Sequence, residues 1–106
     1  MDVVFAYVTA GSVEEAERLA RTVVSERLAA CANMIPGMRS VYWWQGEMGE
    51  AEETVVIFKT RRNRFDALAA RVKALHSYDC PCVVALPVTA GLPAYLGWIS
   101  SESAAR

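Results

Sequence analysis

Residues 38–60 read MRSVYWWQGEMGEAEETVVIFKT, and this stretch decides the fold of the chain. β-Branched and aromatic residues dominate positions 38–45, and the same residue types return in TVVIF near the end of the stretch. Such residues favour strands, and the GEMG segment at 46–49 is typical of a turn. The stretch therefore predicts one long β-hairpin, well beyond the usual strand length of about 5–6 residues.

A strand and a helix are expected on each side of this hairpin. Before it, residues 2–9 form a buried apolar run, and Ser12 and Glu15 then fit a capping box that begins a helix over about 13–27. A second strand over 30–36 follows and ends at a Pro-Gly pair. After the hairpin, Asn63 is placed to cap a second helix, which ends near His76. The remaining elements are expected at the following positions: a strand over 82–88, a short helix over 94–101, and a frayed tail over about 102–106.

The order β-α-β-β-α-β is that of the ferredoxin-like, or split βαβ, plan. It predicts a single α+β domain over residues 1–106, a sandwich of two helices on one face of a mostly antiparallel sheet. An overgrown central hairpin and a short C-terminal helix complete this plan.

The other face of the sheet is expected to need a cover of its own. Side chains alternate along a strand, yet in VVFAYV both Phe5 and Ala6 are apolar, and Trp43 and Trp44 cannot share a face. Leaving such a face in water forfeits roughly 25 cal/mol per Å² of apolar surface. The C-terminal segment is too short to cover more than an edge of the sheet. The pattern therefore predicts a homo-oligomer in which the sheets of neighbouring copies cover one another.

Composition and charge exclude several classes of protein. The formal net charge of −1 and the absence of a basic block speak against nucleic acid or an anionic membrane as partners. No apolar run approaches the roughly 20 residues that span a bilayer. The N-terminal segment lacks the basic lead-in of a signal peptide, and three cysteines do not suit a closed disulfide framework. Reduced thiols and a cytoplasmic location are therefore expected.

Four ordered blocks carry a resemblance to a known family: LAACANMIPGMRSVYWWQG at 28–46, EETVVIFKTR at 52–61, HSYDCP at 76–81 and YLGWI at 95–99. Together they resemble the CutA family, the divalent-cation tolerance proteins. The resemblance implies a ferredoxin-like protomer in a tight homotrimer, related in architecture to the PII-type signalling proteins. It also implies a role in tolerance of copper or another divalent metal ion, whereas the residues by themselves establish no cofactor.

The match has one departure, in the segment HSYDCPC. His76, Tyr78 and Pro81 take the places that the family pattern gives them. Relatives usually place a glutamate after that proline and an aliphatic residue before it, whereas this chain has Cys82 and Cys80. The thiols are therefore this chain's own feature.

Four residues are candidate metal ligands: Cys31, His76, Cys80 and Cys82. Thiolates and imidazole suit Cu(I), but the paired-cysteine pattern of a structural zinc site is absent. On a strand, Cys80 and Cys82 would lie on the same face, about 6.5–7 Å apart along the chain. This separation is poorly suited to the binding of one ion by both thiols. The alternatives are that the cysteines are small buried hydrophobes or a redox pair, and that His76 only pairs with the negative end of its helix.

A second candidate site is a polar cleft between subunits. Lys59 follows VVIF within a strand, where a buried ammonium needs a partner such as Glu53, Glu52 or Asp79, unless the side chain reaches solvent at the strand end. PII-type trimers bind ligands between subunits, and by that analogy alone the cleft would take a small anionic ligand. Its candidate residues are Tyr42, Trp44, Glu53, Lys59, Tyr78 and Asp79.

The leading hypothesis is thus a trimeric divalent-cation tolerance protein that binds copper or another divalent metal ion. The alternative is a PII-like trimeric regulator without a metal role. An RNA-recognition module is disfavoured because EETVVIFKT lacks the exposed aromatic pattern of such modules. No arginine-bearing phosphate loop follows the first strand, and no nucleophile has an evident orienting partner, so an enzyme is not expected.

Overall fold

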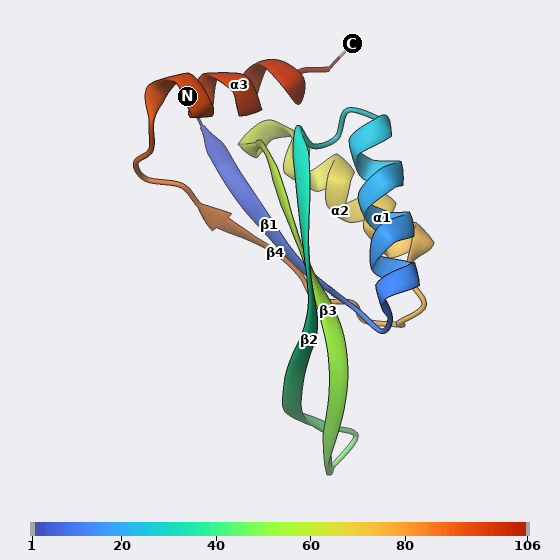
Figure 1. Ribbon diagram of the computed structural model, residues 1–106. Helices are drawn as coiled ribbons and strands as arrows, with labels where there is room; N and C mark the ends of the chain where they lie inside the picture. The colour runs from blue at the N-terminus through green and yellow to red at the C-terminus, as the bar shows by residue number, and fades with distance from the viewer. Residues whose placement is uncertain (1, 106) are drawn as a thin grey trace.

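A computed structural model describes residues 2–105 as one four-stranded antiparallel sheet with helices packed on it (Figure 1). The elements are β1 (Val3–Ala10), α1 (Val13–Ser25), β2 (Cys31–Trp44), β3 (Glu47–Arg61), a 3₁₀ turn (Arg62–Arg64), α2 (Phe65–Leu75), β4 (Val83–Pro87) and α3 (Pro93–Glu102). The strand order is β2-β3-β1-β4, and every neighbouring pair is antiparallel. The predicted α+β, ferredoxin-like order of elements is confirmed.

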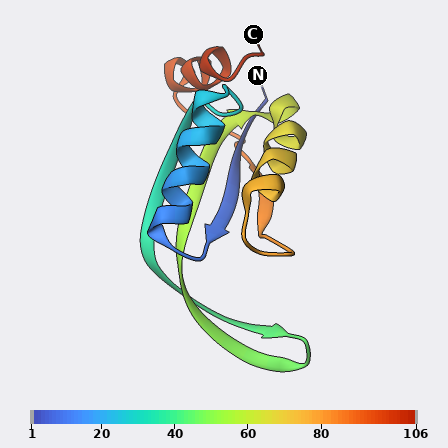
Figure 2. The ribbon, with the colours of Figure 1, turned by 90° about the vertical axis from the view of Figure 1, so that its right-hand side faces the viewer.

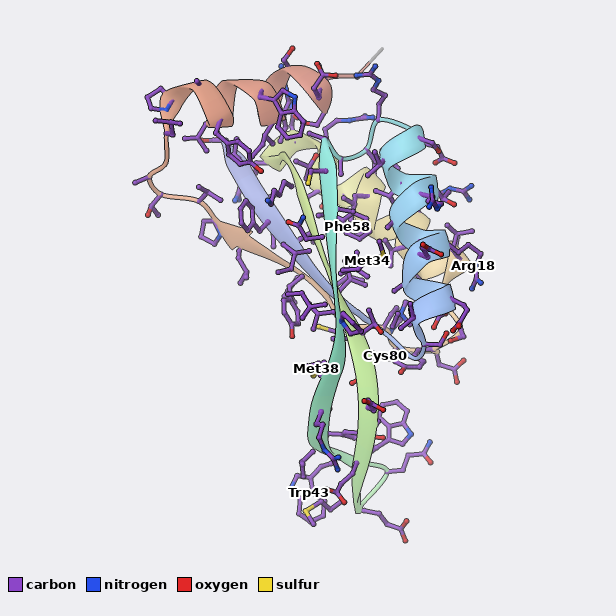
Figure 3. All side chains as sticks on the ribbon, viewed as in Figure 1. Arg18, Met34, Met38, Trp43, Phe58 and Cys80 are labelled. Atoms are coloured by element: carbon purple, nitrogen blue, oxygen red, sulfur yellow. The ribbon has the colours of Figure 1, made fainter. Side chains whose placement is uncertain are left out.

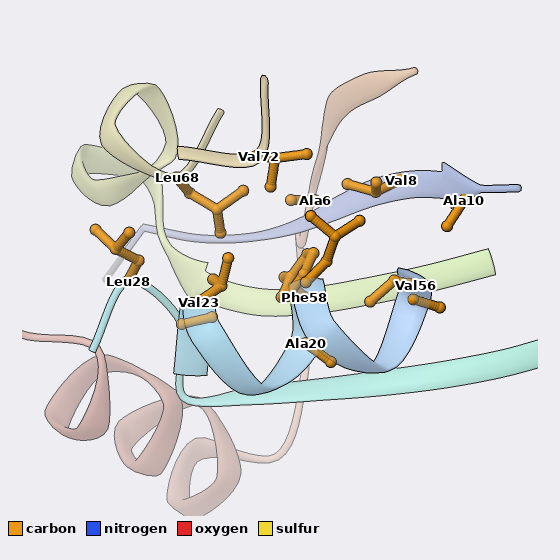
Figure 4. Close-up of a cluster of buried hydrophobic side chains, with 13 residues drawn as sticks. Ala6, Val8, Ala10, Ala20, Val23, Leu28, Val56, Phe58, Leu68 and Val72 are labelled. Carbon is orange, nitrogen blue, oxygen red and sulfur yellow. The ribbon is translucent and has the colours of Figure 1, made fainter. Parts of the chain in front are cut away.

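Helices α1 and α2 cover one face of the sheet, and α3 lies across one end of it (Figures 1 and 2). The core between sheet and helices is apolar and closed (Figure 4). Its centre is Phe58, which is fully buried. Burying a side chain of this size contributes about 1.5–3 kcal/mol relative to leaving it in water. The same cluster includes Ala6, Val8 and Val56 from the sheet and Leu19, Val23, Leu68 and Val72 from the helices.

The two covering helices begin differently. Ser12 Oγ accepts a 3.1 Å hydrogen bond from the Glu15 N–H, so the predicted cap of α1 is confirmed. The predicted cap of α2 at Asn63 is wrong, because Asn63 lies inside the 3₁₀ turn and α2 begins at Phe65 without a side-chain cap. The turn follows β3 directly and is held by a 2.9 Å bond from the Arg62 N–H to the Asp2 carbonyl. The Phe65 N–H at the start of α2 in turn donates to the Arg62 carbonyl of the 3₁₀ turn.

β2 is one strand with a bulge, where the sequence pattern indicated two. Ile35 pairs with Val55 and Met38 with Glu53, so one residue of β2 is in excess at Pro36-Gly37. A proline is tolerated here because β2 is an edge strand, and Gly37 adopts a φ of +77° that other residues rarely take. Bulges bend a strand and increase its twist. This one separates the part of β2 in the sheet from the part that leaves it.

Beyond the bulge, β2 and β3 extend past the sheet as an arm, residues 38–53 (Figure 2). The arm curves beneath the end of the body that carries the segment between α2 and β4 (Figure 2). At its tip, Gln45 and Gly46 have φ of +52° and +82°, as in a two-residue type I′ turn. The turn thus lies one residue earlier than the GEMG segment indicated. Trp43 near the tip is 74 % exposed, and Val41 and Met48 are also exposed.

The face of the sheet opposite the helices is apolar, as predicted. Ile35, Val84 and Leu86 belong to this face by register and are each about half exposed. α3 covers only the end of the sheet near β1 and β3. We call the uncovered part of this surface the open face.

The C-terminal end is better packed than expected. α3 runs to Glu102, and Ser103 is fully buried, with its hydroxyl accepting a 3.1 Å bond from the Arg61 N–H. The expected fraying is therefore wrong for residues 102 and 103, while residue 106 lies outside the described part of the chain. Arg27 Nη1 also contacts Glu102 Oε1 at 2.8 Å, tying the helix to the end of α1.

Candidate functional site

A groove of about 810 Å³ lies where the arm leaves the body. The arm forms one wall and the segment between α2 and β4 the other, with the end of β1 between them. Met38 lies near the base of the arm and Trp43 near its tip (Figure 3). The groove gathers most of the side chains expected at the functional site: Tyr42, Trp44, Glu53, Tyr78, Asp79, Cys80 and Cys82.

Glu53 accepts two side-chain hydrogen bonds within the groove. Its Oε1 accepts a 2.7 Å hydrogen bond from Ser40, and its Oε2 accepts a 2.9 Å bond from the Tyr78 hydroxyl. Burial, and then the bond to Glu53, raise the pKa of Tyr78 to about 12. Sequence reasoning missed Ser40, although it is opposite Ala51 in the hairpin and so shares a face with Glu53. The sequence pattern placed the turn of the hairpin too late, and this hid the pairing of β2 with β3.

The two thiols on the other wall differ in environment. Neither lies on a strand, since β4 begins at Val83, so the predicted strand geometry for the pair is wrong. Pro81, between the two cysteines, has no backbone N–H with which to hydrogen-bond a neighbouring strand. Cys80 is exposed, whereas Cys82 is half-buried. Burial and the nearby Glu53 carboxylate raise the pKa of Cys82, so its thiol stays protonated at neutral pH.

His76 lies outside the groove, and its ring is fully buried. Its Nε2 is 2.7 Å from the Thr9 carbonyl, and its Nδ1 accepts a 3.0 Å bond from the Tyr78 N–H. Both ring nitrogens are therefore engaged within the protomer. This arrangement gives His76 a structural task and leaves no lone pair free for a metal ion.

Cys31 is distant from the other thiols. It pairs with Lys59 at the far end of the hairpin strands, while Cys80 and Cys82 line the groove at the base of the arm. Within residues 2–105 of one protomer, no group of three or more His, Cys, Asp or Glu side chains is arranged to hold a metal ion. The four candidate ligands are thus not brought together in one protomer.

Lys59 is also separate from the groove. It lies six positions from Glu53 on β3, which is about 20 Å at the rise of a strand. Its Nζ donates a 2.9 Å hydrogen bond to the Tyr95 hydroxyl and lies 5.4 Å and 5.3 Å from the ring centres of Phe5 and Tyr95. None of the expected carboxylates pairs with it. The residues of the predicted cleft therefore lie in two places. Most of them line the groove, whereas Lys59 lies against the rings of Phe5 and Tyr95.

Behind the groove, Glu15 holds the segment that forms one of its walls. Its carboxylate accepts a 3.1 Å bond from the Gly11 N–H and a 2.8 Å bond from the Ser77 N–H, and the residue is only 6 % exposed. Burial alone would raise the pKa of Glu15, but the hydrogen bonds from Ser77 and Gly11 outweigh it and the pKa is lowered. The capping box marked Glu15 in the sequence, but its bond to Ser77 spans 62 positions and had no local signal.

The chain is similar to known proteins over nearly its whole length. The family model described as "CutA1 divalent ion tolerance protein" matches residues 4–102. The divalent-cation tolerance protein CutA of Thermus thermophilus is 47 % identical over 96 residues, covering 91 % of this chain and 93 % of the relative. A solved structure, described as the periplasmic divalent cation tolerance protein CutA from Archaeoglobus fulgidus, has a TM-score of 0.93 and 42 % identity. It covers 96 % of this chain and 99 % of the other.

Some relatives are longer than this chain. The chloroplastic protein CutA 1 of rice is 46 % identical over 97 residues, which is 92 % of this chain but 55 % of the rice protein. This chain thus spans about half the length of that relative. The names of these proteins describe no enzymatic reaction.

The expected cytoplasmic location is contradicted by the same relatives. One is described as periplasmic and another as chloroplastic, so reduced thiols and the lack of a basic lead-in do not indicate the compartment of this family. Within residues 2–105, no helix is both long enough and apolar enough to cross a membrane. Sequence, family model and structure agree over the described residues, and the chain belongs to the CutA1 divalent ion tolerance family.

Proposed function

We propose that this protein is a homotrimer that acts in divalent-cation tolerance and binds a soft or borderline metal ion in the groove. The observation that carries the proposal is the groove itself, which brings two thiols and two carboxylates to the base of the arm: Cys80, Cys82, Glu53 and Asp79. Family membership supports the role in divalent-cation tolerance. The role is that of a binding protein rather than of an enzyme.

The assembly is supported by the surface that one protomer leaves in water. The open face exposes Ile35, Val84 and Leu86, and the arm exposes Trp43 and Met48. Large contiguous apolar surfaces are rarely left uncovered in soluble proteins. The arm leaves the body at the edge of the open face, where it can reach a neighbouring copy. A closed ring of three copies gives every arm a neighbour and every open face a cover.

The donors in the groove fit a metal ion of the Cu(I) or Zn²⁺ type. Thiolates prefer such ions over Mg²⁺ or Ca²⁺, and Glu53 supplies a carboxylate beside them. Over residues 2–105, one protomer does not arrange three such ligands around a single point. We therefore expect a neighbouring protomer or solvent to complete the coordination. Because the raised pKa of Cys82 opposes thiolate formation, metal affinity should increase with pH.

The competing role, binding of a small anionic ligand in the groove, has less support. Glu53 and Asp79 line the groove, and the one cationic side chain there is Arg39. Lys59, which was expected to receive the anion, lies outside the groove and hydrogen-bonds Tyr95. The balance of charge in the groove favours a cation.

Native mass spectrometry with and without Cu(I) or Zn²⁺, under reducing conditions, tests assembly and metal content together. We expect a trimer that takes up metal. Cys80→Ser with Cys82→Ser should lower the stoichiometry or weaken binding at least tenfold, because two of the proposed ligands are lost. Cys31→Ser is the matched control, since Cys31 lies outside the groove, and it should bind as the unaltered chain does. A trimer that retains no metal ion at moderate excess would refute the metal role and leave the assembly standing.

A further inference from the structure

A third sulfur-bearing side chain lines the groove beside the two thiols. Met38 is the first residue of the arm, and it lines the groove together with Cys80 and Cys82. It is half-buried, and Figure 3 shows it near the base of the arm, as it does Cys80. The groove is therefore richer in soft donors than its two thiols alone indicate.

The position of Met38 is set by the pairing of the arm strands. Met38 lies directly opposite Glu53 in the ladder of β2 and β3. Its Sδ is 3.2 Å from the Ser40 hydroxyl oxygen, which is itself 2.7 Å from Glu53 Oε1. A hydroxyl has one proton, and the shorter contact with the charged carboxylate takes it. The lone pairs of the Met38 sulfur thus stay available to a ligand in the groove.

The thiol of Cys82 approaches the same carboxylate from the other wall of the groove. After burial, the charge of Glu53 is the second cause that raises the pKa of Cys82, an effect that requires the two groups to be near each other. Cys80 lies two positions earlier, in a bend rather than on a strand, so the extended spacing does not hold the two thiols apart. Met38 and Cys82 therefore flank Glu53, with Cys80 beside them on the second wall.

The harder donors near the groove are already engaged. Both oxygens of Glu53 accept hydrogen bonds, one from Ser40 and one from Tyr78, and both ring nitrogens of His76 are held within the protomer. A metal ion that used Glu53 or His76 would have to compete with these bonds. The three sulfur atoms can be used without breaking a hydrogen bond to a carboxylate or to the imidazole ring.

We propose that Met38 is a third metal ligand of the groove, and that Met38, Cys80 and Cys82 together make it selective for Cu(I) over Zn²⁺. Thiolate and thioether donors suit Cu(I), which is satisfied by three of them. Zn²⁺ takes four ligands, and thioethers are not among those it uses in proteins. Each thiol releases its proton on binding, and copper enters and stays as Cu(I). This inference rests on the proposed function, since it names an ion and a ligand for the same groove.

Two methionine variants of the full chain test the inference. Met38→Leu removes the sulfur and keeps the size and apolar character of the side chain, so the fold should be retained. Met34→Leu is the matched control, because Met34 is also partly exposed on β2 but pairs with Val56 before the bulge and lies outside the groove (Figure 3). Circular dichroism and native mass spectrometry check that both variants fold and assemble as the unaltered protein does.

Competition with a chromophoric Cu(I) chelator under anaerobic, reducing conditions measures Cu(I) affinity, and a zinc-sensitive dye measures Zn²⁺ affinity. X-ray absorption at the copper edge counts the sulfur neighbours of the bound ion. We expect three sulfur neighbours in the unaltered protein and in Met34→Leu, and two in Met38→Leu. The Cu(I) affinity of Met38→Leu should fall at least tenfold, while its Zn²⁺ affinity stays within about twofold.

The outcomes separate this inference from the proposed function. Equal Cu(I) affinities and equal sulfur counts in Met38→Leu and Met34→Leu would overturn the role of Met38 and leave metal binding by the thiols standing. Equal losses of Cu(I) and Zn²⁺ affinity in Met38→Leu would overturn the selectivity. Uptake of neither ion by the unaltered protein would refute the proposed metal role and this inference together.

Discussion

The Tyr78 hydroxyl donates a 2.9 Å hydrogen bond to Glu53 Oε2 and so joins two parts of the chain 25 positions apart. Tyr78 lies in the segment between α2 and β4, and Glu53 lies where the arm leaves the sheet. This contact ties the base of the arm to the helical layer through a side chain, in addition to the backbone ladder of β2 and β3. The position of the arm therefore depends on the segment that also carries the two groove thiols.

Replacing Tyr78 with Phe should destabilise the protein by about 1 kcal/mol. The lost hydrogen bond has a charged acceptor, but the group is only partly buried and Ser40 still binds the same carboxylate. Equilibrium unfolding in urea measures the change. Tyr95→Phe is the matched control, because its hydroxyl accepts an exposed bond from Lys59, and its loss should be smaller. Equal losses in the two variants would contradict the importance of the Glu53 contact.

Replacing Glu15 with Gln should change how stability depends on acid. The pKa of Glu15 is lowered in the folded protein from its ordinary value of 4.5, so the unfolded chain binds the proton more readily. Its contribution to stability is therefore complete above about pH 4.5 and is lost as the pH falls through the lower, folded value. Thermal unfolding between pH 7 and 3 should show a shallower acid loss in the variant than in the unaltered protein. Parallel curves would show that the carboxylate of Glu15 contributes nothing to the acid response.

Substitutions at the tip of the arm should have opposite effects. Gly46 has a φ of +82°, so Gly46→Ala strains the backbone and should destabilise the hairpin by about 1–2 kcal/mol. Gln45 has a φ of +52°, which asparagine tolerates better, so Gln45→Asn should stabilise it by a few tenths of a kcal/mol. Hydrogen exchange of the arm amides should speed up in the first variant and slow down in the second. The same sign of change in both would argue against a type I′ turn.

The thiols should differ in their rates of alkylation. Cys80 is exposed, whereas burial and the Glu53 carboxylate raise the pKa of the half-buried Cys82. Because the thiolate is the reactive form, iodoacetamide at neutral pH should label Cys80 at least several times faster than Cys82. Mass spectrometry of peptides after short exposure gives both rates in one sample. Glu53→Gln should narrow the difference, since it removes the charge that opposes the Cys82 thiolate, and a difference that stays the same would assign the effect to burial alone.

The fold was predictable because its elements are specified locally. The β-branched and aromatic residues within 38–60 specify the hairpin, and the capping box at Ser12 and Glu15 begins α1 where expected. The bulge at Pro36-Gly37 was not predicted, since it is a mismatch between β2 and β3 that only their pairing reveals. The cap of α2 was mispredicted because a 3₁₀ turn, Arg62–Arg64, lies between β3 and α2 and includes Asn63.

The sequence predicted which residues form the site better than it predicted how those residues are arranged. Tyr42, Glu53 and Cys82 do line one groove. Lys59 was grouped with Glu53 because a buried ammonium needs a partner, but six positions of strand separate the two residues on β3. The structural role of His76 depends on Thr9, 67 positions away, and no local pattern marks such a partner.

The strand pairing of the arm also limits how the arm can change during evolution. Side chains alternate between the two sides of the arm, and the pairing of β2 with β3 places Ser40 on the side of Glu53. Inserting one residue into each strand at the base of the arm would turn Tyr42 and Trp44 away from the groove, and inserting two would restore them. Arms of this kind should therefore lengthen or shorten in steps of two residue pairs, so that arm lengths across descendants of one ancestor differ by even numbers of residues per strand.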